Sequence, residues 1–207
     1  MQAYKTIRTA SSDTFTEKKS KFIGHICPVT TQEEAMAFIQ EKKAEFWDAT
    51  HNVYAYVLRD GQLHRYSDDG EPQGTAGLPV LDVLLKEELV DCCVVVTRYF
   101  GGILLGTGGL VRAYSHGSKL AVDAGGIVTM AMCSRLQISC DYNFYGRLSS
   151  LIPEMGGIVE QTEYADTVTV YCKMPSQLVD AFDAKLFDSS FGKYRSKKTE
   201  EFFSAID

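Results

Sequence analysis

The most unusual stretch of the chain is Arg98-Tyr99-Phe100-Gly101-Gly102-Ile103-Leu104-Leu105-Gly106-Thr107-Gly108-Gly109-Leu110-Val111-Arg112. The continuous apolar run before it, at residues 92–97, predicts a buried strand. Apolar side chains at helical spacing after it predict one face of a helix, formed by Leu110, Tyr114, Gly117, Ala121 and Ala124. The fold therefore depends on how a glycine-rich loop joins this strand to this helix.

The start of that helix has the features of an anion site. Backbone N–H groups at a helix N-terminus favour anions, and glycines let a ligand come close to them. Arginine can add bidentate contacts to phosphate. The predicted anion-binding or nucleic-acid-binding residues are Arg98, Gly101, Gly102, Gly106, Gly108, Gly109, Arg112 and Lys119.

Known nucleotide-binding loops do not explain these glycines. A P-loop ends in Gly-Lys-Ser/Thr, and the Rossmann pattern that starts at Gly106 reaches Val111 where it requires glycine. The alternative interpretation is structural: the glycines permit tight turns and close packing of helix on sheet.

A second loop, at residues 67–79, carries three carboxylates within four positions. Asp68, Asp69 and Glu71 are candidate ligands for Mg²⁺, which binds through one or two carboxylate oxygens while a phosphate completes its shell. The alternative is an acidic turn whose aspartates cap backbone amides. Pro79 suits the first turn of a following helix.

Candidates for acid–base or nucleophilic chemistry are few. His51 comes just before an apolar strand, where it is either a general base or phosphate ligand or a structural histidine. No Gly-x-Ser-x-Gly motif occurs. The six cysteines form neither a Cys-x-x-Cys pair nor a zinc pattern, so we expect reduced and mostly buried thiols.

Residues 133–207 predict a small α+β domain. Alternating apolar side chains indicate a first strand, at Leu136, Ile138, Cys140 and Tyr142. Asn143 is expected to cap one helix and Ser176 a second one. Three further strands are predicted, at residues 158–162, 167–174 and 193–203. The order β-α-β-β-α-β is that of a ferredoxin-like fold.

Residues 1–132 predict a different α+β domain. Thr31 and Glu34 suggest a capping box at the start of a helix. Apolar runs at 53–58 and 92–97 indicate buried central strands, each followed by a glycine-bearing loop and a helix. Because no Gly/Ser/Pro linker marks the boundary, we expect two small domains packed together.

Charge limits the classes of partner. The chain of 207 residues has a formal charge of −6, divided into −2 for residues 1–135 and −4 for residues 136–207. This argues against sequence-blind binding to nucleic acid but allows a local site for few phosphates. The C-terminal basic cluster indicates either RNA contact or a lysine-protected edge strand, at Lys193, Arg195, Lys197 and Lys198. Without an apolar span or signal sequence, we expect a cytoplasmic protein and no membrane partner.

The two glycine motifs, 67–77 and 98–110, together with Ser20-Lys21-Phe22 and His51-Asn52, resemble the IMPACT family of the bacterial YigZ type. The resemblance covers essentially the whole chain. It implies an N-terminal domain similar to a small-subunit ribosomal protein, elongation factor G domain IV and GHMP kinases. It also implies a ferredoxin-like C-terminal domain similar to elongation factor G domain V. Many members carry a cysteine where this chain has Val53.

Three functional hypotheses follow. The first is a binding protein for RNA, the ribosome or a translation factor that modulates translation through the glycine/arginine loop. The second is a Mg²⁺-dependent enzyme acting on a phosphorylated small molecule or peptide, with His51 as base. The third is a docking module for a protein partner. The sequence favours the first, leaves enzymatic activity open, and does not indicate an oligomeric state.

Overall fold

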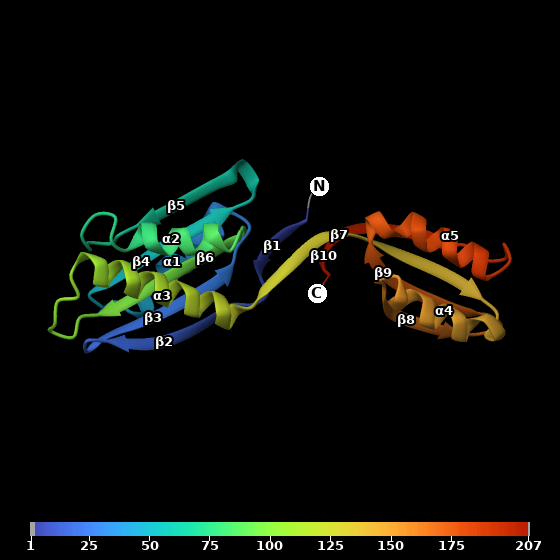
Figure 1. Cartoon of the computed structure of the whole chain (residues 1–207), viewed down its shortest axis with the longest axis horizontal. Coiled ribbons are helices and arrows are strands. Elements are labelled where there is room, and N and C mark those ends of the chain that lie inside the picture. Colours follow the sequence, from blue (N-terminus) through green and yellow to red (C-terminus); the bar gives the residue numbers. More distant parts are fainter. Residues whose placement is uncertain (1–2, 207) are drawn as a thin grey trace. The chain divides into compact units, whose positions relative to one another are not determined.

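The computed structural model describes residues 3–206 and divides into two compact units, one of residues Tyr4–Val128 and one from Thr129 onward (Figure 1). The chain passes between the units inside the long strand β7 (Ile127–Cys140), which also contains the boundary predicted after residue 132. The two sheets and five α-helices make this an α+β protein, as the sequence predicts. Each unit is described by itself below.

The first unit is a five-stranded sheet with helices on both faces. Its elements are β1 (Tyr4–Ile7), β2 (Ser11–Glu17), β3 (Ser20–Pro28), α1 (Gln32–Glu45), β4 (His51–Leu58), β5 (Leu63–Ser67), α2 (Gly77–Lys86), β6 (Cys92–Tyr99) and α3 (Thr107–Gly125), with a 3₁₀ turn at Asp60–Gln62. The strand order is β2-β3-β6-β4-β5, neighbouring strands are antiparallel, and β1 lies outside this sheet. Helices α2 and α3 pack on one face and α1 on the other.

Strand β6 shows why the central strands are continuously apolar. Cys92, Val94 and Val96 belong to the core under α2 and α3, whereas Cys93 and Val95 belong to the core under α1. Alternate side chains of a strand point to opposite faces, so a strand covered on both faces needs apolar residues throughout. This explains the run that the sequence shows before the glycine loop.

The structure tests two local predictions for this unit. The Thr31 side chain accepts a hydrogen bond from the Glu34 amide, as the capping box requires, and the Glu34 carboxylate binds the backbone N–H groups of both Thr30 and Thr31. Strand β4 is followed by the exposed edge strand β5 before the loop and α2. The apolar pattern typical of a strand is absent from residues 63–67, because the side chains of β5 are mostly exposed and polar.

The second unit has the predicted ferredoxin-like order. Its elements after β7 are α4 (Tyr142–Glu154), β8 (Ile158–Tyr164), β9 (Val168–Pro175), a 3₁₀ turn (Ser176–Leu178), α5 (Val179–Ser189) and β10 (Lys197–Ala205). Four strands lie in the order β10-β7-β9-β8 with antiparallel neighbours, and β1 pairs with β7 as the fifth strand of the sheet. Asp141, not Asn143, caps α4, and the Ser176 hydroxyl bonds to Ser134 and caps no helix.

The six cysteines are free thiols, and all except the half-buried Cys27 are buried. Burial raises the pKa of Cys92 to about 12, which keeps this thiol protonated. No helix within residues 3–206 is both long and apolar enough to cross a membrane.

Candidate functional site

Two loops that are distant in sequence meet at one cavity of the first unit. The β5–α2 loop contributes Glu71 and Pro72, the β6–α3 loop contributes residues from Phe100 onward, and β4 contributes His51. Antiparallel pairing of β4 with β6 places His51 opposite Arg98, so the sheet register brings the two loops together. We call this space of about 450 Å³ the His51 cavity; its polar and charged walls are Thr50, His51, Glu71, Arg98 and Thr107.

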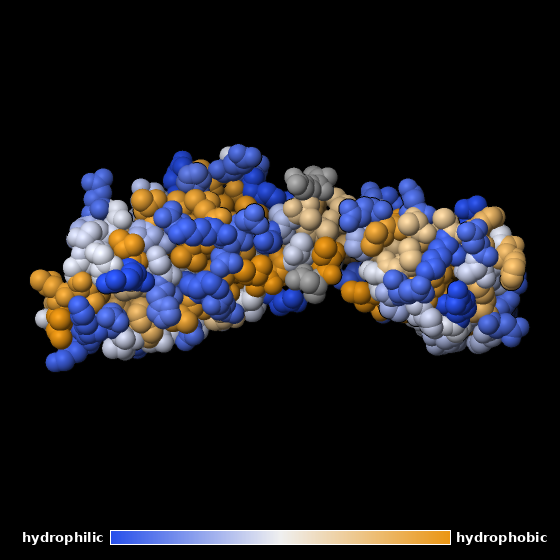
Figure 2. All heavy atoms as spheres, in the orientation of Figure 1, coloured by the Kyte–Doolittle hydropathy of each residue, from blue (hydrophilic) through white to orange (hydrophobic). Residues whose placement is uncertain are grey.

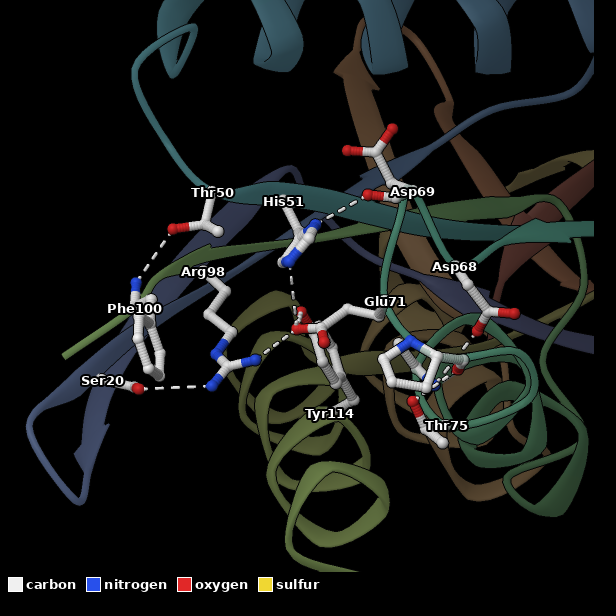
Figure 3. A network of polar contacts seen from close by, with 12 residues as sticks. Ser20, Thr50, His51, Asp68, Asp69, Glu71, Thr75, Arg98, Phe100 and Tyr114 are labelled. Carbon is white, nitrogen blue, oxygen red and sulfur yellow. Dashed lines mark hydrogen bonds and ion pairs between the residues drawn. The ribbon is translucent and has the colours of Figure 1, made fainter. Parts of the chain in front are cut away.

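Glu71 is the centre of a buried polar network beside this cavity (Figure 3). Its Oε1 atom accepts a bond from Nη1 of Arg98 at 2.5 Å and one from the Tyr114 hydroxyl at 2.7 Å. Glu71 is 8% exposed, Arg98 4% and Tyr114 0%. A buried carboxylate needs such compensation, because an unpaired charge in the interior is very costly.

The surroundings fix the state of the two donors. Burial and the Glu71 charge raise the pKa of Tyr114, so its hydroxyl stays protonated and donates. The Nη2 atom of Arg98 lies 3.5 Å from the Ser20 hydroxyl. The Nε atom of Arg98 is buried and has no hydrogen-bond partner in the described chain. The guanidinium therefore keeps one donor that the protein does not use.

His51 is held in one tautomer. Its Nδ1 atom lies 2.8 Å from the backbone carbonyl oxygen of Asp69, which can only accept, so Nδ1 carries the hydrogen. The neutral ring then has its lone pair on Nε2, which lies 3.7 Å from Oε1 of Glu71. The side chain is 19% exposed and lines the cavity. The available nitrogen is therefore a base.

Asp68 and Asp69 hold the β5–α2 loop in place. The Asp68 carboxylate accepts the backbone N–H groups of Gly74, Ala76 and Gly77 at 2.8–3.1 Å. The Asp69 carboxylate accepts the Asn52 amide at 2.7 Å and pairs with Lys43 at 2.5 Å.

The carboxylates predicted as Mg²⁺ ligands thus have other partners in the structure. Asp68 binds backbone amides, as in the acidic-turn interpretation, Asp69 binds an amide and a lysine, and Glu71 binds Arg98 and Tyr114. Within residues 3–206, no group of three His, Cys, Asp or Glu side chains is arranged to hold a metal ion. Their spacing in the sequence suggested one cluster because it does not show which way each side chain turns.

A second cavity lies on the other side of the α3 start. This space of about 540 Å³, the Arg112 cavity, is lined by Phe15, Glu17 and Lys18 of the β2–β3 hairpin and by Arg112 and His116 of α3. Leu105 borders both cavities. The cap of α3 is Gly106 at φ 72°, and no side chain bonds to the free N–H groups of the first turn. The start of α3 therefore has free N–H groups and lies beside both the His51 cavity and the Arg112 cavity.

Comparison with known proteins identifies the group to which the chain is related. The family described as Impact N-terminal domain matches residues 18–122, and a domain of unknown function, DUF1949, matches residues 138–193. IMPACT family member YvyE of Bacillus subtilis is 36% identical over 97% of this chain and 93% of its own length. The chain belongs to the IMPACT family. IMPACT family member YigZ of Escherichia coli is likewise 36% identical, over 89% of this chain and 92% of its own length.

A solved structure extends the likeness to the whole fold. A crystal structure described as that of a hypothetical protein is 33% identical, with a TM-score of 0.61, and covers 97% of this chain and 98% of its own. The IMPACT resemblance and the two-domain α+β fold expected from the sequence are therefore confirmed.

In this IMPACT-family chain, the residues predicted to form one anion site lie in three places. Arg98 lines the His51 cavity and is paired with Glu71, whereas Arg112 lines the Arg112 cavity. Lys119 lies further along α3 and pairs with Glu87 and Asp123. The structure brings the two motif loops together but does not bring these three cations together.

The glycines of the loop serve different purposes. Gly101 packs so tightly on the β2–β3 hairpin that an added Cβ would lie 2.0 Å from the Lys19 carbonyl carbon. Gly102 and Gly106 have φ of 82° and 72°, a region that favours glycine, while Gly108 has open space around it. Close packing therefore explains Gly101, and backbone conformation explains two others.

Sequence reasoning missed Tyr114 as a member of the site. Its position placed it correctly on the buried face of α3, but its hydroxyl reaches Glu71. A tyrosine on a fully buried face is a usable signal, because its hydroxyl then needs a partner.

Proposed function

We propose that this protein binds RNA of the translation apparatus at the Arg112 cavity and the adjoining start of α3, and modulates translation through that contact. One observation carries the proposal. Lys18 and Arg112 both line the cavity, and neither has an ion-pair partner within residues 3–206. Unpaired cations at a cavity wall can bind phosphate oxygens without first breaking an internal salt bridge.

The groups that neighbour Lys18 and Arg112 suit single-stranded RNA. His116 lies in the same cavity with its ring at an edge-on angle to Phe15, at 4.6 Å between centroids. Aromatic surfaces are platforms for unpaired bases, and free N–H groups at a helix start bind phosphate. The family's resemblance to translation-factor domains supports RNA as the ligand.

The charge distribution limits the size of this contact. Glu17 lines the same cavity, and residues 1–135 carry a net charge of −2. We therefore expect only about two phosphate contacts, with a shallow dependence of affinity on salt.

Binding is tested by fluorescence anisotropy with a labelled single-stranded RNA between 50 and 200 mM salt. Two phosphate contacts predict a slope of about −1.4 in log K against log salt, and Arg112→Ala should make the slope less negative by about 0.7. The matched control is Lys197→Ala, which removes an exposed cation from β10 and should leave affinity unchanged. Equal affinity of the wild type and Arg112→Ala at low salt would remove the proposal.

A further inference from the structure

We propose that the His51 cavity hydrolyses carboxylic esters with an apolar acyl group, with His51 as the general base for an attacking water. This activity is separate from RNA binding, because it uses the other cavity beside Leu105. One cavity holds a base, the uncapped start of a helix and an apolar wall.

His51 has the geometry of a general base. The Asp69 carbonyl oxygen fixes the hydrogen on Nδ1, so Nε2 is free to take a proton from water. Glu71 lies 3.7 Å from Nε2, which stabilises the imidazolium that forms. Arg98 and Tyr114 act as positioning residues, because their bonds to Oε1 hold the Glu71 carboxylate in place (Figure 3).

The cavity also offers donors for a developing oxyanion. Gly106 and Thr107 line it at the start of α3, where first-turn N–H groups have no partner within the helix and no side-chain cap. Arg98 lines the same cavity, but its guanidinium is bonded to Glu71 and its Nε atom is buried, so the donors are the N–H groups of the helix start. Such preorganised donors stabilise the tetrahedral intermediate of acyl transfer.

The remaining wall selects an apolar and uncharged group. Five hydrophobic side chains line the cavity: Pro72, Phe100, Leu104, Leu105 and Leu110. Leu104 is 82% exposed and Phe100 45%, and Figure 2 shows hydrophobic surface at the end of this unit where the β6–α3 loop lies. Because Glu71 and Arg98 neutralise each other, the cavity attracts a multiply charged phosphate less than the Arg112 cavity does.

The nucleophile follows from what lines the cavity. None of its lining residues is serine or cysteine, and the Thr50 hydroxyl already accepts the Phe100 amide at 3.0 Å. Thr107 forms no hydrogen bond to His51 in the described structure. Water activated by His51 is therefore the attacking group.

The reaction then balances without another reactant. Nε2 of His51 takes a proton from water as the water oxygen bonds to the acyl carbon, and the carbonyl oxygen becomes an anion held by the N–H groups at the start of α3. The bond from carbon to the alcohol oxygen then breaks, and the imidazolium returns its proton to that oxygen. The products are a carboxylic acid and an alcohol.

The test measures hydrolysis of p-nitrophenyl butyrate by the whole chain. His51→Gln should lower kcat/KM by at least about 100-fold, since a positioned base contributes 10²–10⁴. His64→Gln is the matched control, because His64 is an exposed histidine on β5 of the same unit and any surface imidazole cleaves such esters slowly. Equal rates for wild type, His51→Gln and His64→Gln would overturn the proposal.

A second variant tests the helix start. Thr107→Pro removes the first N–H group of α3 at a position where proline fits a helix, and Gly106 already has the extended ψ of 166° that suits a following proline. We expect kcat to fall about 100-fold with an unchanged thermal unfolding midpoint. Gln32→Pro, at the corresponding first position of α1, should leave kcat unchanged. A folded Thr107→Pro protein with wild-type kcat would contradict the oxyanion role.

Discussion

The two cavities beside Leu105 differ in whether their cationic side chains are paired with carboxylates. In the His51 cavity, Arg98 is buried and bonded to Glu71, whereas Arg112 and Lys18 in the Arg112 cavity have no ion-pair partner in the described chain. Buried side chains that are paired with each other are held in one orientation, which suits catalysis on a bound substrate. Unpaired cations at an open wall suit contacts to phosphate. One glycine-rich loop therefore serves two sites of opposite character.

The largest expected effect comes from breaking the buried pair. Glu71→Ala leaves the Arg98 guanidinium buried without its partner and should lower the free energy of unfolding by about 3–5 kcal/mol. Urea unfolding followed by circular dichroism measures this loss. The control is Glu88→Ala, which removes an exposed carboxylate paired with Lys5 and should have little effect. Similar losses for the two variants would mean that Arg98 is not held by Glu71.

The next effect tests how the loop is anchored to the hairpin that carries Lys18. Gly101→Ala would place Cβ within 2.1 Å of the Lys19 carbonyl carbon and oxygen, so the backbone must shift, at a cost of about 1–3 kcal/mol. Gly108→Ala is the matched control, since no heavy atom lies within 4 Å of its added Cβ. We expect it to keep wild-type stability, and a comparable loss in both variants would contradict the packing.

A smaller effect concerns His25, a buried histidine of the same unit that lies outside both cavities. Burial, aided by the charge of Lys42, lowers the pKa of His25 to about 4. Between pH 6.5 and 4 the unfolded chain therefore binds more protons at His25 than the folded protein does. The free energy of unfolding is then at its full value above pH 6.5 and falls by up to about 1.4 kcal/mol per pH unit towards pH 4. His25→Gln should remove this part of the slope in urea unfolding at several pH values. An unchanged slope would mean that His25 is protonated in the folded protein.

Much of the fold could be predicted because its signals are local. The apolar run of β6, the glycines after it and the alternation of β9 each depend on neighbouring residues, and they occur where the sequence places them. Strand β5 could not be predicted from the sequence, because it is a short edge strand with mostly polar and exposed side chains. Asn143 and Asp141 are both good helix caps, and only the structure shows that the Asp141 carboxylate accepts the Phe144 amide.

The candidate site was predictable in its parts but not in its pairings. Both motif loops were recognisable, yet Glu71 and Arg98 are 27 residues apart, and their contact depends on the β4–β6 register. Sequence spacing favoured a shared role for Arg98 and Arg112, but they line different cavities. Long-range pairing decides which charges are neutralised, and no local pattern contains that information.

The two cavities are proposed to work separately, and measuring both RNA affinity and ester hydrolysis on the same two variants tests this separation. We predict that His51→Gln loses hydrolysis of p-nitrophenyl butyrate but binds labelled RNA as the wild type does. We also predict that Arg112→Ala binds RNA more weakly but hydrolyses the ester at the wild-type rate. If each variant changed both properties, or neither property, the separation of the two cavities would be contradicted.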